Sequence, residues 1–346
     1  MDNEISANTV LDEDQRLAES GGPAVPVIGE RVVPPNGFTR QNGTEADGIA
    51  KRLGMFIVES PRRRLADLVI PASTLLQFKS LLTKIKYHHV LYEDFGLREI
   101  DPYGGRTAIN LYGPPGTGKS FAADAMASEL GMGIIRANYA EIESKYVGET
   151  AKNIKAAFQK ARETQALLFF DEADSILGRR LSNITQSTDH AVNVSRSVML
   201  LELDHFSGVT VFATNLASNY DTAFIRRILG HIEMLLPDAD SRSRLWQFHL
   251  PERLPVQLNA DDRARLVLET EGLAGGDILN IVIYAASIAL EREGPACRIT
   301  FDDFLMAINA SKRAKQEIGV SKRRNTLTLP SPSGRGGSLP DKNSSE

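Results

Sequence analysis

Eight consecutive residues have the types and spacing of a phosphate-binding loop. They are Gly113, Pro114, Pro115, Gly116, Thr117, Gly118, Lys119 and Ser120, and they fit the pattern G-x-x-x-x-G-K-[ST]. Glycines let the backbone curl so that successive N–H groups point at phosphate oxygens. Lys119 would reach the β- and γ-phosphates of a nucleotide, and the Ser120 hydroxyl would ligate Mg²⁺. The alternative is a Gly-Pro turn that precedes an ordinary helix.

The segments on either side of this loop favour phosphate binding. Residues 108–112 predict a strand that enters the loop, and residues 121–130 predict a helix that leaves it and ends at Gly131. The positive N-terminal end of that helix would face the bound anion. We therefore count Phe121, where the predicted helix begins, among the expected nucleotide contacts.

Two adjacent carboxylates follow an apolar run about fifty residues after the loop. The run from Ala166 to Phe170 ends in Asp171 and Glu172, which suits a buried parallel strand with its tip at a ligand site. Asp171 is expected to hold Mg²⁺ opposite Ser120. Glu172 is expected to orient and polarise the water that attacks the γ-phosphate. The alternative is an edge strand that ends in solvated acids.

Strands and helices alternate around these motifs, which predicts an α/β fold with a doubly wound parallel sheet. Further strands are expected over 133–138, 208–215 and 231–236, and helices over 72–92, 149–164 and 192–203. From residue 239 onward the pattern predicts helices only, over 241–250, 260–271, 277–293 and 301–315. We therefore predict a nucleotide-binding domain over 51–238 and a small α-helical lid domain over 239–317.

Both ends of the chain have the composition of disordered segments. Residues 1–50 are rich in Asp, Glu, Gly, Pro and Asn, and residues 318–346 in Ser, Pro, Gly, Lys and Arg. We interpret them as an N-terminal arm and a C-terminal tail. The basic cluster Pro61-Arg62-Arg63-Arg64 is interpreted as a solvated face.

Composition limits the classes of function. The net charge of −4 gives no global basic field for nucleic acid. The single cysteine, Cys297, cannot form an intrachain disulfide, so a cytoplasmic location is the default expectation. No apolar run has the length of a membrane span, and the N-terminus lacks the features of a signal peptide.

Taken together, the motifs resemble those of AAA+ ATPases, and of the AAA clade proper. The residues that carry the resemblance are Pro115 to Ser120 (Walker A), Phe170 to Ser175 (Walker B) and Ala213-Thr214-Asn215 (sensor 1). The likeness runs from about residue 65 to 315. It implies ATP as the nucleotide and a role for Asn215 in placing the attacking water; a strand-end cap is the alternative for Asn215.

The resemblance continues through Asp221 to Arg227, the segment that carries arginine fingers in this family. It implies that Arg226 and Arg227 reach the γ-phosphate held by a neighbouring subunit, where a guanidinium offsets developing charge. The site would then be complete only in a head-to-tail ring, for which six is the family's usual number. The alternative is that both arginines are surface charges of a helix.

Residues 143–149 resemble the family's first pore loop. The likeness implies that Tyr146, Val147 and Gly148 line a central channel and grip an extended polypeptide; a buried tyrosine in a turn is the alternative. Gly275-Gly276 stands where some related groups place a phosphate-contacting arginine, and Ile228 stands where the family often has phenylalanine.

These features predict an ATP-hydrolysing ring motor that remodels, unfolds or disassembles a protein partner. A nucleic-acid-handling ATPase of the helicase or clamp-loader type stays open because of Lys145 and Arg179-Arg180. A nucleotide switch with little turnover is a third interpretation. The sequence does not identify the protein partner.

Overall fold

The fold comes from a computed structural model, which describes residues 41–102, 107–138, 142, 148–178, 187–215 and 220–324. Side chains of residues 41–47, 175, 187–191 and 318–324 are not described. The predicted pore-loop residues Tyr146 and Val147 lie outside the described residues, as does most of the expected arm and tail. By its contacts the chain divides after Glu45, and the elements that position the site belong to the second unit, Ala46–Glu346.

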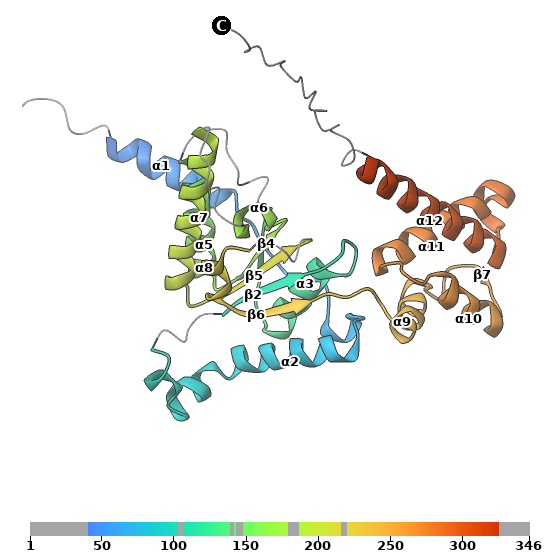
Figure 1. Cartoon of the computed structure of the whole chain (residues 1–346), viewed down its shortest axis with the longest axis horizontal. Helices are drawn as coiled ribbons and strands as arrows, with labels where there is room; N and C mark the ends of the chain where they lie inside the picture. The colour runs from blue at the N-terminus through green and yellow to red at the C-terminus, as the bar shows by residue number, and fades with distance from the viewer. Residues whose placement is uncertain are drawn as a thin grey trace, which may run out of the picture. The chain divides into compact units, whose positions relative to one another are not determined.

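A six-stranded sheet in the order β1-β3-β4-β5-β2-β6 forms the centre of this unit (Figure 1). Its strands are β1 (Val58–Glu59), β2 (Thr107–Tyr112), β3 (Ile134–Asn138), β4 (Leu167–Asp171), β5 (Val209–Thr214) and β6 (Ile228–Glu233). Pairs β3–β4, β4–β5, β2–β5 and β2–β6 are parallel. The predicted α/β parallel architecture is therefore confirmed.

Helices cover both faces of the sheet, which buries its strands on both sides. Buried side chains of α5 (Glu149–Thr164) and α7 (Ser187–His205) pack on one face, and those of α2 (Ala72–Lys86) and α3 (Lys119–Glu129) on the other. Strand β5 divides its side chains between the two faces, with Val209, Val211 and Ala213 opposite Phe212. This alternation follows the two-residue period of a strand.

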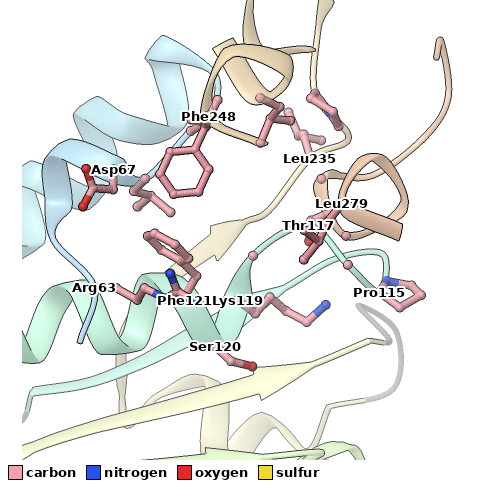
Figure 2. A pocket seen from close by; sticks show the side chains of 18 of the residues that line it. Arg63, Asp67, Pro115, Thr117, Lys119, Ser120, Phe121, Leu235, Phe248 and Leu279 are labelled. Carbon is pink, nitrogen blue, oxygen red and sulfur yellow. The ribbon is translucent and has the colours of Figure 1, made fainter. Parts of the chain in front are cut away.

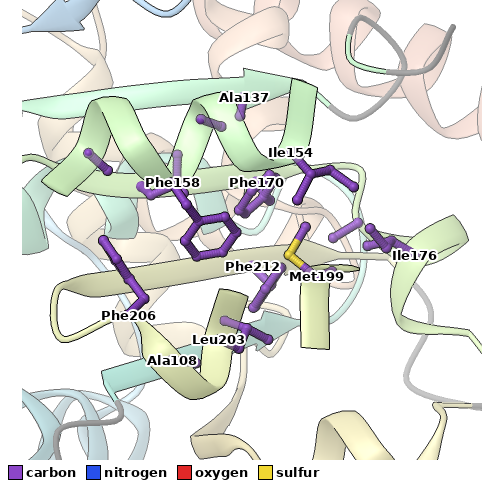
Figure 3. Packing of buried hydrophobic residues seen from close by; sticks show 14 of the residues in the cluster. Ala108, Ala137, Ile154, Phe158, Phe170, Ile176, Met199, Leu203, Phe206 and Phe212 are labelled. Carbon is purple, nitrogen blue, oxygen red and sulfur yellow. The ribbon is translucent and has the colours of Figure 1, made fainter. Parts of the chain in front are cut away.

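Aromatic side chains form the centre of the α5–α7 face (Figure 3). The Phe158 ring lies 5.8 Å from the Phe170 ring and 5.1 Å from the Phe206 ring, between centroids. Phe170 stacks on Phe212 at 5.4 Å. These tilted, edge-on and stacked pairs add to the stability gained by burying their surfaces. They join α5, β4 and β5 directly behind the strand tips that carry the polar residues.

Four helices follow the sheet: α9 (Ala239–His249), α10 (Ala260–Glu269), α11 (Gly275–Glu293) and α12 (Phe301–Arg324). They share a core of their own, in which Trp246 lies edge-on to Phe304 at 5.6 Å. Side-chain caps start α9 at Asp238 and α10 at Asn259. The helical C-terminal region expected from the sequence is therefore present.

The structure corrects the sequence-based assignments at several elements. An antiparallel strand, β1, pairs with β3, and a small parallel pair, β7 (Val256–Gln257) with β8 (Ile299–Thr300), interrupts the helical region. Each of these strands has two residues, too few for a periodic pattern, and exists through a partner distant in sequence. β6 begins at residue 228 rather than 231, because its pairing with β2 continues past an irregularity between Ala108 and Ile109.

Helix ends also differ from expectation. α2 ends at Lys86, and a separate π-helical turn, Val90–Asp94, follows it. Helix α1 (Gln41–Gly54) begins inside the segment that composition favours as disordered, and α12 continues to Arg324, past the expected end at residue 315. Of the described residues, no helix combines the length and apolarity that a membrane span requires.

A buried carboxylate ties the chain before the sheet to helix α3. Asp124 is 2 % exposed, and its Oδ2 accepts hydrogen bonds from the backbone N–H groups of Arg62 (2.8 Å) and Arg63 (2.6 Å). Its Oδ1 pairs with the guanidinium of Arg136 on β3. The basic cluster at 61–64 is therefore anchored through its backbone, although its arginine side chains are exposed.

We expect Asp124→Ala to lower the free energy of unfolding by roughly 1–3 kcal/mol, because two backbone donors and Arg136 lose their acceptor. Urea denaturation would measure this. The control is Glu163→Ala: this exposed carboxylate on α5 accepts only from Gln159, so its removal should change stability by less than about 0.5 kcal/mol. Equal effects of the two substitutions would contradict the anchoring role.

Candidate functional site

Three glycines with positive φ, Gly113, Gly116 and Gly118, shape the loop between β2 and α3, and two of them also lie against neighbouring segments. Gly113 has φ +141°, and a Cβ there would lie 2.4 Å from the carbonyl oxygen of Met234. Gly116 has φ +77°, and a Cβ there would meet Ala274 at 3.3 Å. Both positions therefore need glycine, for backbone conformation and for close approach. The Thr117 hydroxyl closes the loop by donating to the carbonyl of Pro114 at 2.8 Å.

The ammonium group of Lys119 lies inside this loop. Lys119 is 8 % exposed, and its Nζ donates to the carbonyls of Gly113 and Pro114, both at 2.8 Å. Burial lowers the pKa of Lys119, and the carboxylates of Asp171 and Asp174 oppose that shift. A cation held this way, beside a curled backbone, fits a loop that receives phosphate oxygens.

Ser120 and Asp171 meet although fifty residues separate them. The Ser120 hydroxyl donates to Oδ2 of Asp171 at 3.0 Å, and Oδ1 of Asp171 accepts the backbone N–H of Glu172 at 2.9 Å. An oxygen pair of hydroxyl and carboxylate is the donor set that Mg²⁺ prefers. The two residues predicted to hold the metal ion therefore stand where one ion would touch both.

Glu172 is exposed and has φ +52°, in the left-handed region that residues with a Cβ rarely occupy. Such strained backbone is most frequent at functional sites, where surrounding structure enforces it. Here the hydrogen bond to Asp171 and the end of β4 fix the turn.

Asn215 directly follows β5, which lies between β4 and β2 in the sheet. Its backbone N–H faces the Asp174 carboxylate, 3.2 Å from Oδ1 and 3.3 Å from Oδ2. Asn215 and Asp171 both line the cavity that contains the loop. Sequence reasoning missed Asp174, although its place three residues after Asp171 was a usable signal.

The cavity over the loop has a volume of about 480 Å³ and is lined by both the sheet region and the helical region. The backbone N–H of Gly276, at the start of α11, donates to the carbonyl of Gly116 at 3.0 Å. The Phe121 ring lies edge-on to Phe248 of α9 at 6.4 Å, and the guanidinium of Arg63 lies over it at 5.1 Å (Figure 2). The lid is thus in contact with the loop and with the first turn of α3.

Several of the residues lining this cavity were not predicted. They come from the segment before α2, from the end of α9 and from the start of α11: Arg63, Asp67, Leu68, Phe248, His249 and Leu279. Burial and the nearby charge of Arg63 lower the pKa of His249, which favours a neutral imidazole there. No local pattern marks these positions, since only the fold brings three distant segments to one cavity.

The two predicted arginine fingers lie away from this cavity and in different surroundings. Arg227 makes a bidentate ion pair with Asp204 of α7, at 2.8 and 2.7 Å, and also donates to the carbonyl of Ala223. Arg226 is exposed, and its guanidinium has no hydrogen-bond or ion-pair partner among the described residues. Of the predicted pore loop, only Gly148 is described, directly before α5.

Comparisons with known proteins also find similarity to AAA ATPases. Residues 109–236 match the family model described as ATPase family associated with various cellular activities (AAA). The chain is 31% identical over 280 residues to the proteasome-activating nucleotidase of Methanopyrus kandleri, which covers 78% of this chain and 62% of the relative. It is 32% identical over 265 residues to that of Pyrococcus furiosus, covering 74% and 64%.

A plant protein is also similar. The chain is 33% identical over 215 residues to the 26S proteasome regulatory subunit 10B homolog A of Arabidopsis thaliana, covering 60% of this chain and 53% of that protein. In all three comparisons the chain spans less than two thirds of the relative's length.

Gly113→Ala should destabilise the protein more than Gly131→Ala, and should weaken nucleotide binding. Gly131 has φ +66° with nothing within 4 Å of an added Cβ, so its substitution should cost only the backbone penalty of about 1–2 kcal/mol. At Gly113 the end of β6 must also move, which adds about 1–3 kcal/mol. Urea denaturation and titration with a fluorescent ATP analogue measure both quantities; indistinguishable variants would contradict the close approach.

Proposed function

Because the chain carries an ATPase domain of the AAA family over residues 109–236, we propose that it is an ATP-hydrolysing ring motor that remodels, unfolds or disassembles a protein partner. One observation carries the proposal. The loop, the Ser120–Asp171 pair, Glu172 and Asn215 converge at one edge of the sheet, while Arg226 lies exposed elsewhere, without a partner among the described residues. In the proposed ring, a subunit with this arrangement would hold most of a hydrolytic site and present the missing cation to another subunit.

The residues present fit a nucleoside triphosphate with Mg²⁺. In this proposal residues 113–120 form the phosphate loop, the backbone N–H groups of residues 116–120 and the Lys119 ammonium bind phosphate, and Phe121 contributes to the wall beside it. Ser120 and Asp171 hold the metal ion. When bound, Mg²⁺ would neutralise charge on the β- and γ-phosphate oxygens.

Glu172 and Asn215 are proposed to act on the attacking water. The Glu172 carboxylate accepts a hydrogen bond from the water and draws off its proton, which makes the oxygen a better nucleophile. The side-chain amide of Asn215 is proposed to hold the same water in line for attack. The hydrogen bond from the Asn215 backbone N–H to the Asp174 carboxylate fixes the position of the residue. Each group performs a positioning or proton-transfer task that its side-chain chemistry allows.

Arg226 is proposed to be the arginine finger, and Arg227 to fix the segment that carries it. The bidentate pair with Asp204 occupies the Arg227 guanidinium within its own chain, so that residue is committed to α7. The exposed guanidinium of Arg226, which has no partner in the part of the chain that the structure describes, is proposed to reach a phosphate of a neighbouring subunit. Head-to-tail contacts of this kind close into rings, and six subunits is the number that the family resemblance implies.

A protein is the proposed substrate class. The similar proteins are a proteasome-activating nucleotidase and a proteasome regulatory subunit, and we transfer from them to this chain only the ATP-driven handling of protein. Tyr146, Val147 and Gly148 are proposed to grip the polypeptide. The residues that kept a nucleic-acid function open, Lys145, Arg179 and Arg180, lie outside the described part of the chain, so no described observation favours that function. Cytoplasmic location stays a prediction from the lone cysteine.

Glu172→Gln should bind ATP with unchanged affinity and hydrolyse it at least about a hundredfold more slowly, because the amide cannot take a proton from water. Isothermal titration and single-turnover phosphate release measure the two quantities. The matched control is Glu233→Gln, an exposed carboxylate at the end of β6 that does not line the cavity, which should retain full activity. Full turnover by Glu172→Gln would exclude the assigned role.

Arg226→Ala and Arg227→Ala should separate the two arginines. Arg226→Ala should bind nucleotide normally and lose roughly 10³-fold in hydrolysis rate. Arg227→Ala should lose less activity and up to about 1 kcal/mol of stability, since it breaks a partly exposed ion pair.

The rate per subunit should also rise with protein concentration for the wild type, because the site is completed by a neighbour. A rate that is independent of both concentration and Arg226 would indicate a monomeric switch and overturn the ring.

A further inference from the structure

Four polar side chains form a network beneath the carboxyl ends of the central strands, in which Asn110 and Thr214 are buried, Tyr220 is half-buried and His231 is exposed. We call Asn110, Thr214, Tyr220 and His231 the Tyr220 network, after the residue that contacts the other three. They come from β2, the end of β5, the segment before α8 (Thr222–Ile225) and β6. Asn110 and Thr214 are 0 % exposed. None of the four was predicted as a functional residue.

The Tyr220 hydroxyl is the centre of this network. It hydrogen-bonds to the hydroxyl of Thr214 and accepts from Nδ2 of Asn110 at 3.2 Å. The same Asn110 amide lies 3.4 Å from Nδ1 of His231, and the Tyr220 and His231 rings stack with centroids 6.4 Å apart. Asn110 and His231 are direct partners in the β2–β6 register.

His231 connects the network to Ile225, the residue before the exposed Arg226. A hydrogen bond to the backbone of Ile225 raises the pKa of the imidazole, and burial lowers it by more. Ile225 immediately precedes Arg226 in the chain.

Each end of the network leads to a different part of the proposed reaction. On one side, Thr214 immediately precedes Asn215, whose N–H faces Asp174. On the other side, Tyr220 precedes Asp221, which caps α8 by accepting the N–H of Ala223 at 2.9 Å. Helix α8 ends at Ile225, and Arg226 follows. The chain thus leaves the nucleotide edge at Asn215 and returns to the network before it presents the arginine.

A second contact ties the same segment to the region after β4. Tyr220 forms an isolated antiparallel bridge with Gly178, and the N–H of Asp221 donates to the carbonyl of Leu177 at 2.9 Å. Leu177 ends α6 (Asp174–Leu177), the helix that begins at the Asp174 contacted by Asn215. The nucleotide edge and the Arg226 segment are therefore joined by two short routes.

Stability alone does not explain buried polar groups at this place. Apolar side chains of similar volume would fill the space around Asn110 and Thr214 without desolvation cost, and Oδ1 of Asn110 has no hydrogen-bond partner among the described residues. The hydrogen bonds that Asn110 Nδ2 and the Thr214 hydroxyl make with Tyr220 instead favour one arrangement of the elements that they join.

We propose that the Tyr220 network is a positioning relay, which sets the placement of Arg226 according to the state of the nucleotide edge at Asn215 in the same subunit. The inference rests on the proposed ring motor, in which Arg226 completes the neighbour's site. Tyr220, Thr214, Asn110 and His231 are positioning residues, since none of them lines the nucleotide cavity. The relay would let the nucleotide state of one subunit govern hydrolysis in the next.

Two threonines of β5 provide a matched test. Thr214 and Thr210 are both buried on the same face of the strand, but the Thr210 hydroxyl has no hydrogen-bond partner. Thr214→Val and Tyr220→Phe should each lower kcat by roughly 2- to 10-fold, because each removes the hydrogen bond between Thr214 and Tyr220 that positions Arg226. KM and ATP affinity should be unchanged. Thr210→Val should leave kcat unchanged. Equal kcat for Thr214→Val, Tyr220→Phe and wild type would overturn the relay.

A mixing experiment separates the relay from the ring itself. Glu172→Gln subunits supply Arg226 but not hydrolysis, and Arg226→Ala subunits supply a working site without the arginine, so only the mixture should be active. Adding Tyr220→Phe to the Glu172→Gln subunits should lower this reconstituted rate by roughly 2- to 10-fold, while adding Thr210→Val should not change it.

The possible results are distinct. An unchanged reconstituted rate with Tyr220→Phe would overturn the relay while leaving the shared site intact. A mixture with no activity above that of its parents would overturn the shared site, and the relay with it. A reduced rate with Tyr220→Phe but not with Thr210→Val would support the relay.

Discussion

The rest of the site depends on how tightly the Gly113–Gly118 loop is enclosed. The carbonyl of Met234 leaves no room for a side chain at Gly113, and the carbonyl of Gly116 accepts the N–H of Gly276. The loop is therefore held between the end of β6 and the start of α11. Because its shape is fixed from both sides, its N–H groups and the buried Lys119 are preorganised for an anion.

Strand order explains why the polar residues meet. β5 lies between β4 and β2, and the three strands are parallel, so Asp171, Asn215 and the loop emerge at one edge. The aromatic core behind them, from Phe158 to Phe212, keeps the strand tips from shifting independently. The 3.0 Å separation of Ser120 and Asp171 is thus a property of the packed sheet rather than of either motif alone.

The subunit treats its two adjacent arginines differently, and this bears on how subunits communicate. Asp204 retains Arg227, whereas Arg226 is exposed at the end of a segment that returns to the Tyr220 network. A polar network in a sheet core costs desolvation energy, so its presence is best understood through the arrangement that it enforces. In the proposed ring, that arrangement links the nucleotide edge at Asn215 of one subunit to the placement of Arg226, which would contact the nucleotide of the neighbouring subunit.

The sequence by itself determined the resemblance to AAA ATPases, the α/β parallel fold and the motifs on which the site is built, because the P-loop and the strand ending in Asp171-Glu172 are local patterns of strand, turn and helix. Their roles in catalysis stay predictions. Only the tertiary structure decided which residues complete the cavity, how Arg226 and Arg227 differ, and that Asn110 contacts Tyr220 across 110 positions. The two-residue strands β1, β7 and β8 were likewise visible only in the tertiary structure. Such features are pairings between distant segments, and a single sequence carries no periodic signal for a contact that exists only after the sheet has formed.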